Sequence, residues 1–213
     1  EAAVKHSMLR AISGGPIYFS DKVGNTIPEV LSPLVYSDGK ILRMDRSAKP
    51  TEDCLFIDPL KEGGLKLHNV TSWGQKKKGG IISAYNVSPS NQKVSFTPSD
   101  IPDIEKSDRY WIYNFIKKNV VSLGKNEAFS DDIESGGFGW YVILPETGNI
   151  DCFGLIDKYV CFQAVENITE NGNTQTVVLH ATGTVGWASK KAAKKVVLNG
   201  SDVTKDVKQN GEF

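Results

Sequence analysis

The stretch Gly14–Asn25, which reads G-G-P-I-Y-F-S-D-K-V-G-N, is the most informative part of this chain. A short apolar run, Ile17–Phe19, begins after Pro16 and ends just before Asp21. A run of this length is typical of a strand buried on both faces, as in a parallel sheet. Proline is tolerated there because the first residue of a strand need not donate to the ladder. We therefore predict a strand over residues 16–20.

Two charged residues, Asp21 and Lys22, follow this predicted strand directly. In a barrel of parallel strands the chemistry lies at the carboxyl ends of the strands. Aspartate is also an ordinary opening residue of a turn. Spacing alone therefore leaves a functional and a purely local interpretation of Asp21 open.

Helical patterns flank the predicted strand on both sides. Thr26 and Glu29 fit a capping box, and Pro28 fits the first turn of the helix that this box would open. Before the strand, Gly14-Gly15 supplies a C-terminal stop for a helix whose apolar residues are Ala3, Val4, Met8, Ala11 and Ile12. A single helix-strand-helix unit cannot close a core, so we expect the chain to begin inside a barrel or a doubly wound sheet.

From Leu55 onward, short apolar runs separated by turn residues replace the helical pattern. Many short strands with regular turn signals are typical of an antiparallel sandwich or jelly roll. We place the boundary between the two patterns near Pro50–Pro59, where turn and linker residues cluster. The predicted strands span residues 65–70, 80–87, 92–96, 110–115, 138–144, 160–165, 174–182 and 195–198.

The composition limits the classes of partner. The chain has 213 residues, and 25 Lys and Arg balance 25 Asp and Glu, so bulk attraction to nucleic acid or to an anionic membrane is not expected. The lysine runs 76–78 and 190–195 are more typical of solvated loop tips than of a polyanion-binding patch. Neither a signal peptide nor a spanning apolar run is evident, and the first residue is Glu1. We expect a fragment, a processed chain or a trimmed expression product.

The three cysteines, at positions 54, 152 and 161, have no C-x-x-C spacing, and the three histidines are scattered. We therefore expect no metal and no cofactor, and we expect free thiols in a reducing, cytoplasmic compartment. Of the four tryptophans, we expect most to pack in the core, although tryptophan can also form a sugar-binding platform. The acidic pairs Asp131/Asp132 and Asp151/Asp157 are interpreted as turn and surface residues, since adjacent acids in a strand point to opposite faces.

Several runs resemble raffinose synthases and related α-galactosidases of glycoside hydrolase family 36. The more specific ones are A-V-K-H-S-M-L-R-A-I-S-G-G-P-I-Y-F-S-D-K-V-G-N over residues 3–25 and D-G-K-I-L-R over residues 38–43, followed by K-P-T-E-D-C-L-F-I-D over residues 49–58. Weaker similarity continues in order through residues 67–70, 79–86, 153–159 and 196–200. Residues 73–78 and 119–136 depart from the family pattern.

The resemblance implies a mainly β chain in which a C-terminal antiparallel β-sandwich follows the last helix-strand-helix piece of a (β/α)8 barrel. Residues 1–52 would be the barrel remnant, and residues 53–213 would be the sandwich. The resemblance also implies a retaining mechanism, which needs two carboxyl groups about 5–5.5 Å apart. Both would lie on barrel strands that precede residue 1, and no position here matches them, so no catalytic residue is assigned.

Asp21 and Lys22 are the substrate-binding candidates that remain. At the end of the last barrel strand they would border the sugar cleft, where a carboxylate accepts hydrogen bonds from hydroxyl groups and an ammonium donates them. The alternative is that they pair with each other or with a neighbouring loop.

Two functional interpretations follow. In the first, the chain is the C-terminal portion of a glycoside hydrolase or transglycosidase acting on raffinose-type α-galactosides, and it braces the barrel and closes the sugar cleft. Its partners would be an oligosaccharide substrate and the missing N-terminal part. The alternative is a free-standing, non-catalytic β-sandwich module that binds carbohydrate or protein. An exposed apolar face on the first helix would favour the barrel interpretation, and a covered face would favour the module.

Overall fold

A computed structural model describes residues 2–18, 20–73 and 77–209. Strands dominate these residues, and every strand pair is antiparallel, so the predicted mainly β fold class is confirmed. Phe19 of the predicted first strand and Lys76 of the basic run lie outside the described residues. No helix in the described ranges is long and apolar enough to cross a membrane.

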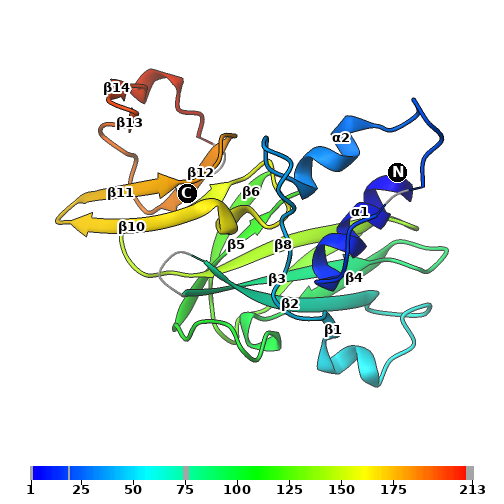
Figure 1. The fold of residues 1–213 in the computed structure, drawn as a ribbon. Coiled ribbons are helices and arrows are strands. Elements are labelled where there is room, and N and C mark those ends of the chain that lie inside the picture. Colours follow the sequence, from blue (N-terminus) through cyan, green and yellow to red (C-terminus); the bar gives the residue numbers. More distant parts are fainter. Residues whose placement is uncertain (1, 19, 74–76, 210–213) are drawn as a thin grey trace.

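The largest element is a six-stranded sheet with the order β1-β2-β3-β8-β5-β6 (Figure 1). Consecutive strands β2 and β3 form a long hairpin, whereas β8 joins the sheet between β3 and β5. The strands of this sheet are β1 (Lys49–Pro50), β2 (Leu65–Trp73), β3 (Lys77–Tyr85), β5 (Arg109–Asn114), β6 (Asn119–Gly124) and β8 (Phe138–Pro145).

Both faces of this sheet are covered, so its central strands β3 and β8 are buried along most of their length. Because side chains alternate between the two faces of a strand, neighbouring residues feed two separate cores. Trp140 and Val142 belong to one core, and Tyr141 and Ile143 belong to the other. The apolar runs here are therefore continuous rather than alternating, as expected for strands buried on both sides.

A second, small sheet covers one face and makes the sandwich. It consists of β4 (Gln92–Phe96) and β7 (Phe129–Ile133). Phe96 and Phe129 pack around Tyr141, with ring centroids 4.9 and 5.2 Å from that of the tyrosine. This aromatic cluster fixes the small sheet on the large one.

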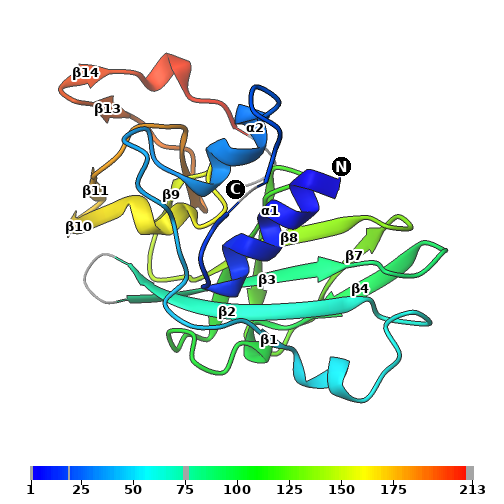
Figure 2. The ribbon, with the colours of Figure 1, turned by 45° about the vertical axis from the view of Figure 1, so that its right-hand side comes forward.

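The other face is covered by helix α1 (Ala2–Ser13) together with the pair β9 (Ile150–Leu155) and β12 (Val185–Ser189). Figures 1 and 2 show α1 lying across β2 and β3. Met8, Ala11 and Ile12 are fully buried there, in the predicted apolar stripe. The apolar face of the first helix is thus covered, which is the outcome that favours a self-contained module.

The remaining elements lie at the edges of this three-layered body. The hairpin β10 (Val165–Asn171) and β11 (Thr174–Leu179) and the short pair β13 (Val197–Leu198) and β14 (Ser201–Asp202) project from it (Figure 1). Helix α2 (Pro28–Leu31) is a single turn that leads into a 3-10 turn at Ser32–Leu34.

Three local expectations differ from the structure. Pro16, Ile17, Tyr18 and Ser20 lie outside the strands, because no other described strand runs beside them and a buried ladder needs partners on both sides. The predicted capping box is not formed, since Ile27 is the N-cap and makes no side-chain cap bond. The predicted strand over residues 160–165 is mostly a 3-10 helix at Cys161–Ala164, a short buried apolar run that periodicity cannot distinguish from a strand.

Candidate functional site

Residues 14–27, here called the α1–α2 loop, contain both predicted site residues. The loop begins where α1 ends, at Gly14, whose φ of +70° is unfavourable for residues with a side chain. A Cβ at this position would lie 2.1 Å from the carbonyl oxygen of Arg46. Only glycine therefore allows the chain to leave the helix in this direction so close to the neighbouring segment.

A buried side chain, Asn69 on β2, fixes the same point. Its Nδ2 donates to the carbonyl oxygens of Ile12, at 2.7 Å, and of Arg46, at 2.6 Å. Its Oδ1 accepts from the backbone N–H of Val70 at 2.8 Å. One amide thus connects the end of α1, the segment before β1 and the large sheet, and it satisfies carbonyl groups that a helix end leaves unpaired.

Beyond this anchor the loop turns outward. The Arg10 guanidinium lies 4.8 Å from the centroid of the Tyr18 ring, an arrangement that favours a cation–π contact. Asp21 and Lys22 are both exposed, and the backbone N–H of Asn25 donates to the carbonyl of Lys22 at 2.9 Å to close a turn. Neither charged side chain forms an ion pair with another described residue, so the alternative pairing is not seen. A role in sugar binding for Asp21 and Lys22 stays a prediction.

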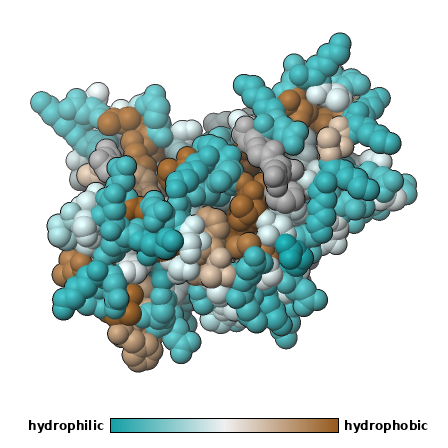
Figure 3. Space-filling model, turned by 180° about the vertical axis from the view of Figure 1, so that it is seen from behind, coloured by the Kyte–Doolittle hydropathy of each residue, from teal (hydrophilic) through white to brown (hydrophobic). Residues whose placement is uncertain are grey.

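Apolar side chains accompany the charged pair on this loop. Val23 is 97% exposed, and Tyr18 and Ile27 are more than half exposed. On the face of the molecule seen in Figure 3, hydrophobic residues form separate small patches among hydrophilic ones. The α1–α2 loop therefore has a rigid base and a tip that offers both charges and apolar surface to a partner.

The other acidic candidates have structural roles. Asp131 on β7 accepts from Asn114 Nδ2 at 3.0 Å and from the Tyr141 hydroxyl at 2.9 Å, while Asp132 points outward, as the alternation predicted. The interpretation of Asp151 as a surface residue was wrong. It is buried on β9, where it accepts from Trp111 Nε1 at 2.7 Å and from Thr147, because a buried indole N–H needs an acceptor.

Glu146 forms ion pairs that no sequence pattern predicted. Its carboxylate is nearly buried at the end of β8, pairs with Lys190 and Arg109, and accepts from Ser122 Oγ at 2.6 Å. Burial alone would raise the pKa of Glu146, but the hydrogen bonds from Lys190 and Ser122 outweigh it and hold the pKa below its usual range. Glu146 thereby ties the C-terminal segment to the large sheet.

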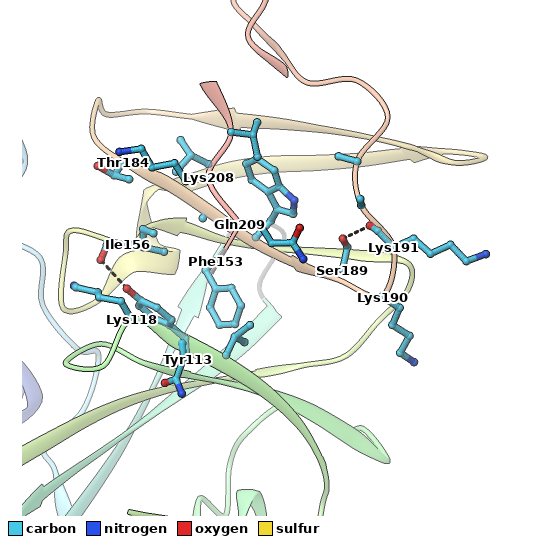
Figure 4. Close-up of a pocket in the computed structure, with 18 of the residues that line it drawn as sticks. Tyr113, Lys118, Phe153, Ile156, Thr184, Ser189, Lys190, Lys191, Lys208 and Gln209 are labelled. Atoms are coloured by element: carbon cyan, nitrogen blue, oxygen red, sulfur yellow. Dashed lines mark hydrogen bonds between the residues drawn. The ribbon is translucent and has the colours of Figure 1, made fainter. Parts of the chain in front are cut away.

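The tryptophans divide as expected. Trp73, Trp111 and Trp140 are buried in the core, and Trp187 on β12 is half-buried. Trp187 lines a cleft of about 500 Å³ that we call the C-terminal cleft (Figure 4). Its walls come from the β5–β6 turn, β9, β12 and residues 204–209, so four distant segments meet there.

Metal and thiol chemistry find no support in the described ranges. No group of three or more His, Cys, Asp or Glu side chains there could hold a metal ion. The cysteines are free, and burial raises the pKa of the Cys152 thiol to about 11 and the pKa of Cys161 further still. Because the thiolate is the reactive form, burial makes the Cys152 and Cys161 thiols weak nucleophiles.

Comparison with known proteins places this geometry in context. Residues 1–94 match the family described as raffinose synthase or seed imbibition protein Sip1. The chain is 45% identical over 163 residues to a galactinol–sucrose galactosyltransferase of Oryza sativa subsp. japonica, which covers 67% of this chain and 20% of the relative. A stachyose synthase of Pisum sativum is 28% identical over 229 residues, covering 93% of this chain and 26% of the relative.

The matches define a class of proteins related to plant galactosyltransferases. Within that class, the chain is a raffinose synthase-like protein, as its motifs indicated, and membership of glycoside hydrolase family 36 is consistent with the matches. The chain spans only 20% to 26% of the length of these relatives.

Solved structures show a weaker likeness. The α-galactosidase I of Mortierella vinacea aligns with a TM-score of 0.45 and 13% identity, over 68% of this chain and 35% of that chain. A β-L-arabinopyranosidase of Geobacillus stearothermophilus aligns with a TM-score of 0.47 and 11% identity, over 70% of this chain and 31% of that chain. At these scores the likeness carries no argument about function.

Proposed function

We propose that this chain is the C-terminal portion of an enzyme that acts on α-galactosides of the raffinose type. The whole protein would cleave or transfer a terminal α-galactosyl group through a glycosyl-enzyme intermediate formed on a carboxylate. Hydrolysis and transfer differ in whether water or a sugar hydroxyl attacks that intermediate. The two reacting carboxylates would belong to a preceding barrel, so this chain supplies neither a nucleophile nor a general acid.

The chain's own contribution would be structural support and part of the cleft wall. The observation that carries this proposal is the α1–α2 loop, whose base is locked by Gly14 and Asn69 while its tip is exposed. A locked base and an exposed tip suit a loop whose partner is another part of the protein. Val23 and Ile27 would pack on that partner, and Asp21 and Lys22 would exchange hydrogen bonds with sugar hydroxyl groups.

The family match supports the galactoside assignment, since it includes the whole α1–α2 loop. The names of the relatives support galactosyl transfer as the reaction. Free cysteines at all three positions support our prediction of a reducing, cytoplasmic compartment.

Sequencing the gene upstream of the codon for Glu1, and expressing the longer product, tests this proposal. We expect an open reading frame that encodes barrel strands with two catalytic aspartates, and a product that turns over a chromogenic α-galactoside. Asp21→Asn and Lys22→Gln in that product should raise KM, whereas Asp132→Asn, an exposed carboxylate on β7, serves as the matched control. A product without α-galactoside turnover or transfer would contradict the proposal.

A free-standing binding module is the second candidate, and the covered face of α1 favours it. Met8, Ala11 and Ile12 need no barrel to bury them, because the large sheet already does. Saccharide binding to the 213-residue chain at the α1–α2 loop, with no activity in the extended gene product, would establish this alternative.

A further inference from the structure

The C-terminal cleft has a chemistry that the proposed function does not use. Tyr113 and Phe153 form its floor but are almost fully buried, so the half-buried Trp187 supplies the aromatic surface that a ligand could reach. Uncharged polar side chains share this lining and come from separate segments: Asn119, Thr184, Ser189 and Gln209. An aromatic face next to amide and hydroxyl groups suits a hydroxylated ring, whose C–H face stacks while its hydroxyl groups exchange hydrogen bonds.

The charges around the cleft are mostly of one sign. Among the described residues that line it, Asp157 is the one carboxylate, and it already accepts from the backbone N–H of Thr184 at 2.9 Å and pairs with Lys158 at 3.2 Å. Four lysines line the same space: Lys118, Lys190, Lys191 and Lys208. Lys190 already pairs with Glu146, so Lys118, Lys191 and Lys208 are the amines left for a ligand. A concave surface with such an excess of amines attracts anions.

The lysines come from two sides of the cleft, and the side chains of Lys190 and Lys191 extend outward from it (Figure 4). Figure 4 shows Lys118 and Lys208 on one side and Lys190 and Lys191 on the other, with the Phe153 ring between them. Lys118 is held in place, since its Nζ lies 3.6 Å from the centroid of the Phe115 ring. Its φ of 55°, which is uncommon for a residue with a side chain, fixes the direction in which it leaves the β5–β6 turn.

We propose that the C-terminal cleft binds an anionic sugar, meaning a hydroxylated ring that carries a phosphate or carboxylate group. The ring would lie against Trp187, and the acidic group would take charge-assisted hydrogen bonds from lysines on one side of the cleft. A cleft of about 500 Å³ is within the range of roughly 300–1,000 Å³ found for small-molecule sites. The inference is independent of the galactoside proposal, because it uses only residues of this cleft.

Ligand binding would also connect two parts of the chain. Residues 204–209 form the outer wall, and they are mostly exposed and follow a small hairpin, β13–β14. A ligand held between this wall and β12 would order the wall. Cleavage by trypsin after Lys205 and Lys208 should therefore slow when the cleft is occupied.

Titration of the full chain with three probes tests the proposal: galactose 1-phosphate, galactose and inorganic phosphate. Calorimetry measures the affinities. We expect galactose 1-phosphate to bind with a dissociation constant of roughly 1 mM or below. Galactose and inorganic phosphate should each bind at least about tenfold more weakly, because each lacks one set of contacts. Binding should also weaken as salt rises.

Substitutions locate the site. Lys208→Gln, Lys191→Gln and Lys118→Asn each remove one amine from the lining, and asparagine tolerates the left-handed backbone at position 118. At least one of the three should weaken binding about tenfold, the loss of one charge-assisted hydrogen bond. Lys194→Gln is the matched control, because it removes the same charge from the same segment but does not line the cleft. It should leave the affinity within about twofold.

Four outcomes would overturn the proposal. Equal affinity for galactose and galactose 1-phosphate would make the cleft a neutral saccharide site. Equal affinity for inorganic phosphate and the sugar phosphate would reduce it to a general anion patch. Absence of binding by all three probes, or affinities that none of the three lining substitutions changes, would remove the site altogether.

Discussion

The sheet core and the C-terminal segment use the same residue types in opposite ways. In the core, Trp140 is fully buried and donates from Nε1 to the carbonyl oxygen of Tyr159 at 2.9 Å. In the C-terminal region, Trp187 is half-buried beside an open cleft. Lysines divide in the same manner, since Lys66 is almost fully buried on β2, whereas Lys191 is exposed.

Residue type alone therefore does not separate structure from function here. Lys66 is tolerated inside because its ammonium pairs with Asp53 and donates to the carbonyl of Ser95 at 2.8 Å. Lys191 has no comparable environment, so its charge stays available to solvent and to ligands. What a side chain contributes depends on the partners that distant segments bring to it.

The largest difference between the two regions is expected for tryptophan. Trp140→Ala should lower the free energy of unfolding by about 3–5 kcal/mol, because it leaves a large cavity in a close-packed core. The matched change Trp187→Ala should cost less than about half as much, since that ring is only half-buried. Urea denaturation measures both values. Equal losses would mean that the C-terminal region is packed as tightly as the core.

Two glycines of the α1–α2 loop distinguish anchored backbone from open backbone by the stability that each loses on substitution. Gly14→Ala should cost about 3 kcal/mol, because it combines left-handed strain with a clash against the Arg46 carbonyl oxygen. Gly24 has a similar φ, +83°, but nothing lies within 4 Å of an added Cβ, so Gly24→Ala should cost only about 1 kcal/mol. Thermal denaturation compares the two, and equal costs would show that the loop base is not locked.

The next largest difference in stability is expected between two lysine substitutions. Lys66→Ala should cost about 2 kcal/mol, because it removes a charge-assisted hydrogen bond to Asp53 and one to the Ser95 carbonyl. Lys191→Ala should change stability by less than about 0.5 kcal/mol, as is usual for an exposed surface residue. The same urea series measures both. A larger loss for Lys191 would contradict the view of this lysine as available for ligands.

The smallest effect is a pH dependence at the contact between the two regions. The pKa of Glu146 is depressed in the folded protein, so its contribution to stability is complete above the ordinary glutamate pKa of about 4.3 and is lost as pH falls through the depressed value. Glu146→Gln should flatten that part of the pH–stability profile. Glu134→Gln, an exposed control before β8, should leave it unchanged. Identical profiles for the wild type and Glu146→Gln would exclude this contact as a source of stability.

Local patterns predicted much of the fold. The alternation over residues 92–96 gave the bounds of β4, and helical spacing with Gly14-Gly15 gave α1 and its end. Local patterns did not predict the strands that depend on contacts with distant residues. β9 contains Asp151, Cys152 and a glycine with positive φ, so its sequence lacks a strand period, yet Trp111 and β12 stabilise it.

The candidate sites, too, could be predicted only as far as local sequence determines them. Asp21 and Lys22 could be singled out because they follow one apolar run, but whether a partner covers them depends on another part of the protein. The C-terminal cleft could not be predicted, since Tyr113, Phe153 and Trp187 are far apart in sequence and only the fold brings them together. Its sole local signal was the lysine run near residue 190, which is equally typical of a solvated loop.

We propose that this chain supports α-galactoside chemistry whose reacting carboxylates lie in a different part of the protein. The most direct test is the rate at which the purified 213-residue chain releases chromophore from a chromogenic α-galactoside. We predict a rate indistinguishable from the blank. Turnover above the blank that copurifies with the chain would contradict the account, because the catalytic pair would then have to lie within these residues.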